Sequence, residues 1–258
     1  MKGKRPKRNI VLFLVEGKAD RNALQIAISE LYDRIDENIE VFFPTIREDS
    51  EEVGGDITSK IGSHPRNIEE KIYKLFLQDF FDEEKILPKD ISEIIQIIDM
   101  DGVYVPDDAV REVTDSEFGN RVYYGNNEII CPNRARILKR NECKRENLDY
   151  LSSLSVIKVK QKRVPYSAYY FSSNLDHFIH HDANLEYRLK SSLADTYARN
   201  YLGNIEGFVR DISEDPGAVK GMSYDESWSY IKQGTNSLCR YTNINVLFES
   251  LRSDGQLL

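Results

Sequence analysis

The apolar residues of this chain follow two patterns, short continuous runs and stripes with spacings of three and four. Continuous runs at residues 9–17 and 91–99 end at Gly and Asp, which is typical of buried strands. A shorter run at residues 38–45 is stopped by Pro44 and predicts another strand. Residues 24–35 and 67–81 instead show the spacing of amphipathic helices. The resulting order, β-α-β-loop-α-β, predicts an α/β fold with a mainly parallel sheet flanked by helices.

The rest of the chain gives weaker patterns. Residues 47–67 are polar and contain several glycines and prolines, so they predict a surface loop. Residues 122–132 predict a small hairpin around Gly-Asn-Asn, and residues 133–153 predict a basic helix that is continuous or broken. The aromatic run at residues 166–174 alternates and predicts a fourth strand of the core. From residue 184 onward the pattern is helical.

The length of 258 residues is enough for one sizeable core with an extension. We expect a core domain at residues 9–182, interrupted by insertions at about 47–67 and 106–163. A helical extension at residues 183–258 is expected to pack on that core. No apolar run approaches the roughly 18 to 20 residues needed to span a bilayer. Three widely spaced cysteines indicate neither a disulfide framework nor a zinc site, so we expect a cytoplasmic protein with no membrane partner.

The charge of the chain is unevenly distributed. The net charge is −8, yet residues 133–163 contain ten Lys or Arg and three acids, which gives +7 locally and −15 elsewhere. Metal-dependent nucleases often place a basic segment beside an acidic cluster, because phosphates require cations and the metal requires carboxylates. The alternative is an ordinary solvated helix face. The candidate nucleic-acid-binding residues are Lys18, Arg134, Arg136, Lys139, Arg140, Lys158, Lys160, Lys162 and Arg163.

The run EIIQIIDMDGVYVPDD, residues 93–108, places acidic side chains at the end of a predicted strand. It resembles the first motif of haloacid-dehalogenase-type phosphatases. In that resemblance Asp99 would be the nucleophile, Asp101 the general acid, and Mg²⁺ would bridge Asp99 to the phosphate. That family usually opens its core with this motif, whereas three elements precede it here. The family also needs a late acidic pair at a strand end to complete its Mg²⁺ site. The late acidic cluster of this chain, DISEDPG at residues 211–217, follows a helical stretch and no apolar strand.

A second acidic motif lies 83 residues upstream. The first predicted strand ends VLFLVEGKAD, which delivers Glu16 followed by Gly and places Asp20 four residues later at a helix start. This motif resembles the first motif of TOPRIM domains, which are found in topoisomerases, primases and some nucleases. The second TOPRIM motif is a later strand ending in DxD, which Asp99 and Asp101 match. The resemblance implies a TOPRIM-like fold with insertions and a metal-dependent site.

The physical chemistry of this pairing is consistent with a metal site. The carboxyl ends of parallel strands meet at one edge of a sheet, so Glu16 would face Asp99 and Asp101 across a crevice. Carboxylates held together repel one another, and Mg²⁺ or Mn²⁺, which prefer oxygen ligands, would relieve that repulsion. We therefore expect all three to be catalytic and metal-binding, with Glu16 as a ligand or general acid/base. Asp20 and Asp176 are further candidate ligands. In the alternative interpretation, Glu16 and Asp99 merely cap helices.

A third motif begins where the fourth predicted strand ends. The sequence SSNLDH, residues 172–177, resembles a motif of TOPRIM proteins in phage-defence systems, the overcoming-lysogenization-defect-like group and related abortive-infection and retron-associated proteins. Some of these carry SNPxFE at this position, whereas this chain lacks the Pro and the Phe-Glu pair. That departure leaves the role of Asp176 open. Ser173, Asn174 and His177 are candidates for orienting a phosphate or a water.

Together the motifs predict metal-dependent cleavage of nucleic-acid phosphodiesters by an effector of bacterial anti-phage defence. The expected cofactor is Mg²⁺ or Mn²⁺, the substrate is DNA or RNA, and an ATPase of the same defence system is a candidate partner. Two alternatives stay open. One is a phosphatase that uses Asp99 as its nucleophile, and the other is a catalytically inert TOPRIM-fold interaction protein.

Overall fold

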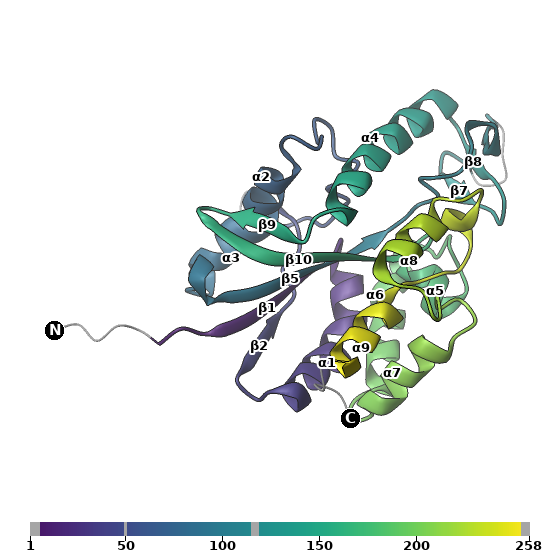
Figure 1. Ribbon diagram of the computed structural model, residues 1–258. Helices are drawn as coiled ribbons and strands as arrows, with labels where there is room; N and C mark the ends of the chain where they lie inside the picture. The colour runs from purple at the N-terminus through teal and green to yellow at the C-terminus, as the bar shows by residue number, and fades with distance from the viewer. Residues whose placement is uncertain (1–5, 49–50, 115–118, 254–258) are drawn as a thin grey trace.

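A five-stranded sheet with the order β2-β1-β5-β10-β9 forms the centre of the computed structural model, which describes residues 6–48, 51–114 and 119–253 (Figure 1). Its neighbouring strands are parallel except for the antiparallel pair β9 and β10. The predicted α/β fold with a mainly parallel sheet is therefore confirmed. The strands of this sheet are β1 (Asn9–Leu14), β2 (Ile39–Phe42), β5 (Ile91–Asp99), β9 (Val156–Val159) and β10 (Lys162–Phe171).

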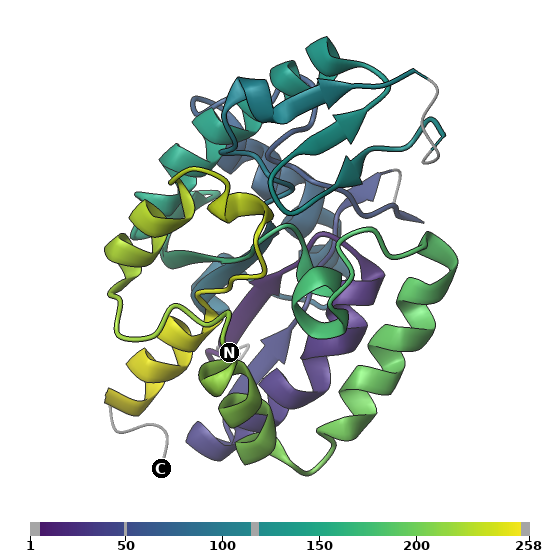
Figure 2. The same ribbon diagram turned by 90° about the vertical axis from the view of Figure 1, so that its right-hand side faces the viewer.

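Helices cover both faces of the sheet (Figures 1 and 2). Successive residues of β1 therefore enter two separate apolar clusters, Leu12 on one face and Phe13 on the other. This arrangement explains the continuous apolar runs in the sequence. One face is covered by α2 (Ile68–Ile72), the π-helical turn η1 (Tyr73–Leu77), α3 (Gln78–Glu83), α4 (Arg134–Ser152) and α8 (Tyr224–Ile231). The other face is covered by α1 (Lys18–Ile35), α5 (Leu175–His180), α6 (Tyr187–Asn200), α7 (Ile205–Glu214) and α9 (Ile244–Ser253).

A small three-stranded sheet stands beside the carboxyl ends of the central strands (Figure 2). The hairpin predicted around Gly-Asn-Asn is confirmed, because the two strands that flank this turn, the second and third of the small sheet in chain order, pair antiparallel. Ile137 of α4 packs into the apolar cluster of this sheet. The strands are β6 (Val110–Glu112), β7 (Tyr123–Tyr124) and β8 (Ile129–Cys131). Shorter elements elsewhere are β3 (Arg47–Glu48), β4 (Glu51–Glu52), and the 3₁₀ turns η2 (Pro88–Asp90), η3 (Asp107–Ala109) and η4 (Asn236–Leu238).

Two elements differ from the sequence expectations. The basic helix α4 is continuous over 19 residues, whereas the sequence left open a break within it. The fourth core strand begins at Lys162, four residues earlier than predicted, and forms a hairpin with β9. Part of the expected insertion at 106–163 thus belongs to the central sheet. Within the described ranges, no helix combines the length and apolarity that crossing a membrane requires.

Candidate active site

Glu16 lies two residues beyond the end of β1, where the chain turns into α1. Its Oε1 accepts the backbone N–H of Asp99 at 3.2 Å. Because β1 and β5 are adjacent and parallel, their carboxyl ends lie at the same edge of the sheet. A single carboxylate therefore joins the ends of the two strands, and the structure places Glu16 against Asp99.

Asp99 and Asp101 occupy the last position of β5 and the turn that follows it. Oδ1 of Asp99 accepts the N–H of Leu175, the first residue of α5, at 3.0 Å. Asp101 has a left-handed backbone with φ of 51°, a conformation that short polar residues adopt more readily than most. Gly102 follows with φ of 67°, and a Cβ there would lie 2.5 Å from the Leu238 side chain. The glycine of the DMDG motif is therefore required by both its backbone and its packing.

Residues 53–59 contribute a carboxylate that the sequence analysis did not identify. Gly54 and Gly55 both have positive φ, and the Gly55 N–H donates to the Glu16 carbonyl oxygen at 2.7 Å. A Cβ on Gly54 would lie 3.1 Å from that same carbonyl oxygen. The two glycines thus allow the segment to lie directly on the turn after β1. Asp56 consequently reaches the site, where its charge acts on Glu16.

A lysine of α4 neutralises two of these carboxylates. The Lys144 side chain is 0% exposed, and its Nζ lies 2.8 Å from Asp101 Oδ2 and 2.9 Å from Asp56 Oδ2. It donates a hydrogen bond to Asp101 and forms an ion pair with Asp56. Burial lowers the pKa of Lys144, but the surrounding carboxylates outweigh it and hold this pKa well above the usual value. Lys144 is therefore a fixed positive charge inside the site.

A second ion pair lies where α5 and α6 approach α1. Lys190 Nζ of α6 is 2.5 Å from Asp176 Oδ2 at the start of α5. Asp20, in the first turn of α1, accepts the N–H of Gly17 through Oδ2 at 2.9 Å, as acids at this position of a helix commonly do. Burial, and then the nearby Asp176, raise the pKa of Asp20 to about 6, against the opposing effect of Lys190.

Burial and mutual repulsion disfavour the charged forms of Glu16 and Asp99. Burial raises the pKa of Glu16 well above its usual value, Asp56 raises it further, and Lys144 opposes both. Burial likewise raises the pKa of Asp99, with the largest electrostatic contribution from Asp20. Glu16, Asp20 and Asp99 therefore favour protonation unless a cation is bound. The group that these three form with the nearby carboxylates is called the acidic cluster below and consists of Glu16, Asp20, Asp56, Asp99, Asp101 and Asp176.

The raised pKa of Asp20 predicts a loss of stability as the pH rises. The carboxyl titrates near 3.8 in an ordinary environment and at about 6 in the fold, so between these values the folded state binds more protons than the unfolded state. The free energy of unfolding therefore decreases with rising pH across this window. The contribution of Asp20, about 3 kcal/mol, is fully present below about pH 4 and is lost as the pH passes through about 6.

We expect Asp20→Asn, which cannot ionise, to escape this loss. In EDTA, the Tm of the variant relative to the unmodified protein should rise between pH 5 and pH 7, and saturating Mg²⁺ should reduce that difference. Thermal unfolding followed by circular dichroism at a series of pH values measures both. A Tm difference that stays constant across this window would contradict the assignment.

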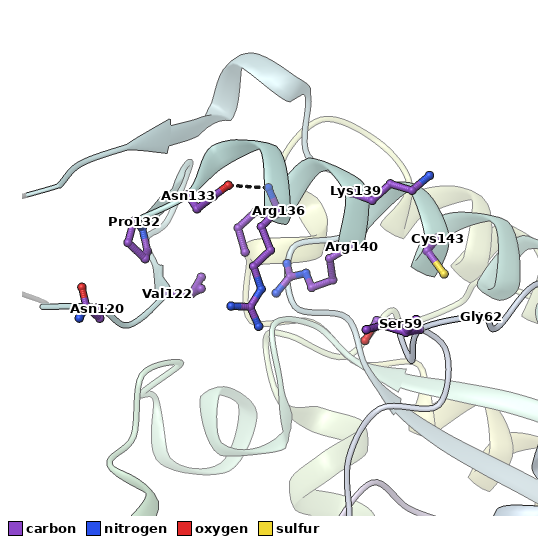
Figure 3. Close-up of a pocket in the computed structure, with 12 residues that line it drawn as sticks. Ser59, Gly62, Asn120, Val122, Pro132, Asn133, Arg136, Lys139, Arg140 and Cys143 are labelled. Atoms are coloured by element: carbon purple, nitrogen blue, oxygen red, sulfur yellow. Dashed lines mark hydrogen bonds between the residues drawn. The ribbon is translucent and has the colours of Figure 1, made fainter.

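Members of the acidic cluster line one cavity, and a second cavity adjoins the first. The first, called the carboxylate cavity, has a volume of about 410 Å³ and is lined by Asp99 and Asp101 together with residues of β7, α6 and the segment before α6. The second, called the α4 cavity, has a volume of about 720 Å³. Figure 3 shows Arg136 and Arg140 extending into it from consecutive turns of α4, while Lys139 lines it with its stem and directs its ammonium end away. Val122 lines both cavities, so they are neighbours.

The fold divides the predicted basic segment into two groups. Arg136, Lys139 and Arg140 line the α4 cavity, and Arg140 also donates to the Asp101 carbonyl oxygen at 2.9 Å. Arg134 instead donates to backbone carbonyls of the small sheet and its approach. The remaining predicted cations lie on the β9–β10 hairpin. They are Lys158, Lys160, Lys162 and Arg163.

That hairpin lies at the opposite end of the sheet from the acidic cluster (Figure 1). The 10 residues of β10 separate the two, which corresponds to about 30 Å of extended chain. The hairpin cations are therefore not beside the carboxylates, although they are close in sequence to those of α4. Lys18 also faces away from the cavities, since it is exposed and pairs with Glu52 at 3.5 Å.

The three residues predicted to orient a phosphate or water differ in whether they reach the carboxylate cavity. Ser173 is fully buried and its hydroxyl donates to the Leu238 carbonyl oxygen at 3.2 Å, which is a structural role. Asn174 lines the carboxylate cavity and caps α5 by accepting the N–H of His177. His177 does not line that cavity. Burial and then Arg240 lower the pKa of His177, which favours its neutral form.

Three residues of the site were not predicted from the sequence, namely Asp56, Lys144 and Lys190. Residues 47–67 were predicted to form a surface loop, but Ile57 and Thr58 are buried and the loop lies on the site. A Gly-Gly-Asp sequence within a polar loop was the signal that could have indicated a close approach of the backbone. A single lysine within a basic helix carries no comparable signal of burial.

A preformed cage of ligands is not present in the part of the chain that the structure describes, where no three His, Cys, Asp or Glu side chains are grouped so as to hold a metal ion. The donors are nevertheless all carboxylate oxygens, which suit a hard divalent cation. No protein-family description, curated protein sequence or solved structure matches this chain.

Proposed function

We propose that this protein cleaves nucleic-acid phosphodiesters with the help of a divalent metal ion bound at the acidic cluster. The observation that carries the proposal is the convergence of Glu16, Asp99 and Asp101 at the carboxyl ends of two adjacent parallel strands, beside cavities that bear arginines. Carboxylates bind the metal and cations bind phosphate, and both are required for phosphodiester cleavage.

The residues present fit Mg²⁺ or Mn²⁺. Mg²⁺ is commonly held by one or two carboxylates and completed by water and substrate phosphate, so a closed cage of protein ligands is not needed. Asp99 and Asp101 line the carboxylate cavity and are accessible from it, and Glu16 contacts the backbone of Asp99. Asp56, which is paired with Lys144, is a further carboxylate at the site. We propose Asp99 and Asp101 as the ligands, with Glu16 beside them as the general acid/base and Asp20 and Asp176 as further candidate ligands.

Each side chain then has a role that follows from its surroundings. A bound divalent ion would neutralise the carboxylates and polarise the phosphate towards attack by water. Glu16, whose pKa is raised by burial, is suited to hold a proton and to release it to a leaving oxygen. Lys190 lines the carboxylate cavity and supplies positive charge for the phosphate. Arg136 and Arg140 would hold the backbone of the strand in the α4 cavity.

The TOPRIM-like identity of the core and the role in anti-phage defence are part of this proposal. They rest on the Glu-Gly and DxD motifs and on the Ser-Asn sequence that follows β10. The arrangement of β1, β5 and β10 side by side brings the three motifs to one edge of the sheet, which supports the resemblance. An ATPase partner would be expected in such a system.

The proposal predicts that the purified protein degrades nucleic acid only when Mg²⁺ or Mn²⁺ is present. Fluorescently labelled DNA and RNA, resolved on denaturing gels, should be cut in Mg²⁺ and remain intact in EDTA, and added Mg²⁺ in excess of EDTA should restore cutting. A generic phosphate monoester assayed in parallel tests the phosphatase alternative. Turnover of the monoester with intact nucleic acid would contradict the proposal, as would an absence of both activities together with an absence of metal binding by calorimetry.

A further inference from the structure

The walls of the carboxylate cavity are rich in tyrosine. Tyr123, Tyr124 and Tyr187 all line it, together with the two aspartates that follow β5. The volume of about 410 Å³ falls in the range of roughly 300 to 1,000 Å³ in which proteins bind small flat ligands. A nucleobase is such a ligand, and aromatic side chains bind it by stacking on its face. The cavity thus combines aromatic walls suited to a base with the aspartates that are proposed to bind the metal.

Three hydrogen bonds hold these walls in place. The Tyr124 N–H donates to Asn184 Oδ1 at 2.8 Å, and Asn184 Nδ2 donates to the Tyr124 carbonyl oxygen at 2.9 Å. The Tyr124 hydroxyl accepts a hydrogen bond from Arg140 Nη1 at 2.8 Å. The small sheet and the segment before α6 are therefore joined across the cavity. These hydrogen bonds keep Tyr123 and Tyr187 beside the cavity even when no ligand is bound.

Tyr187 is the most unusual of these residues because its side chain is 91% exposed. As the first residue of α6, it contributes little to the core, and its ring is presented to the cavity and the solvent. Arg121, which is also exposed, and Lys190 line the same cavity. An exposed aromatic ring with cations beside it is the combination by which proteins bind unpaired nucleotides.

We infer that the carboxylate cavity holds an unpaired nucleobase next to the phosphate that is cleaved, so that the substrate is a single strand. This inference rests on the proposed function and specifies its substrate class. In a duplex the bases are stacked and paired inside the helix and reach a cavity only after they are flipped out. A single strand presents its bases without that unfavourable step. Stacking on tyrosine tolerates every base, so cutting is expected to show little sequence preference.

Binding and cleavage are tested separately with one sequence prepared as a single strand and as a perfect duplex, each as DNA and RNA. Fluorescence anisotropy with the Asp99→Asn protein should show that the single strand binds about tenfold or more tightly than the duplex. Tyr187→Ala in the same background should weaken single-strand binding by about tenfold, while Tyr187→Phe, which keeps the ring, should not. Leu202→Ala, an exposed residue beyond the far end of α6 at 69% exposure, is the matched control and should change nothing.

The outcomes separate this inference from the proposed function. Equal binding of single strand and duplex, or no effect of Tyr187→Ala, would overturn the inference. If the protein with its native Asp99 also cuts duplex and single strand equally, the proposed cleavage stands and the cavity assignment falls. Single-strand binding that depends on Tyr187, without cleavage in any metal, supports the cavity and overturns the proposed activity.

Discussion

Asp99→Asn is expected to lower the rate of metal-dependent cleavage by about 10²- to 10⁴-fold. The substitution removes the charge of a proposed ligand but keeps an oxygen that can accept the Leu175 N–H, so the fold should be retained. In EDTA the variant is expected to be at least as stable as the unmodified protein, because one repelling carboxylate is gone. Initial rates on labelled single strands, with Tm as the check on folding, measure both effects.

Glu16→Gln distinguishes the proposed nuclease from the alternatives. The amide oxygen can still accept the Asp99 N–H, as Glu16 does, yet it cannot exchange a proton or carry charge, so a similar loss of rate is expected. A phosphatase that uses Asp99 as nucleophile would need Asp99 and would retain activity in Glu16→Gln. Glu93→Gln, on the same strand as Asp99 but six residues before it, is the control and should retain full activity. An inert protein would show no effect of any of the three.

Lys144→Met is expected to destabilise the protein by about 3 to 5 kcal/mol, because it leaves buried carboxylates without their cation. For a chain of this size, that change corresponds to a fall in Tm of roughly 10 °C. Met has a similar length and apolar stem, so the loss reports on the charge. Lys139→Met lies on the same helix but removes an exposed side chain that pairs with exposed Glu142, and its effect should stay within about 0.5 kcal/mol.

A second substitution tests whether the loss arises from the acidic cluster. Adding Asp56→Asn to Lys144→Met removes one of the two carboxylates that Lys144 neutralises, so part of the lost stability should return. The double-mutant cycle isolates this coupling. Additive effects of the two substitutions, or an unchanged Tm for Lys144→Met alone, would show that Lys144 does not neutralise the cluster.

The features visible in the sequence were those that depend on local pattern. The apolar runs of β1 and β5 reflect burial on both faces, and each ends directly before its acid, so Glu16 and Asp99 could be placed at strand ends. Parallel pairing then brings those ends together without further information. This is why the juxtaposition of Glu16 with Asp99 could be expected from two motifs that are 83 residues apart.

The features that were not predicted depend on how distant segments meet. Nothing local distinguishes Lys144 from the exposed cations around it, because its burial is decided by where α4 crosses the sheet. The hairpin of β9 and β10 was missed because Pro165 and the basic residues before it are unfavourable signals for a core strand. Pro165 is accommodated where β10 pairs with the short edge strand β9. The basic segment consequently divides between the two ends of the sheet.

The acidic cluster joins parts of the chain that are far apart in sequence, and this has a consequence for the rates of folding and unfolding. Glu16 meets Asp99 across 83 residues, and Lys144 meets Asp101 across 43. Contacts of such long range form after the local ones, because the entropy lost in closing a long loop precedes the stabilisation that the contact provides. The repulsion among these carboxylates is therefore largely absent from the folding transition state.

Interactions absent from the transition state act mainly on the unfolding rate. A divalent cation bound at the cluster should accordingly slow unfolding far more than it speeds folding. The chain would then fold at nearly the same rate with or without the metal, and the metal would determine how long the folded state persists.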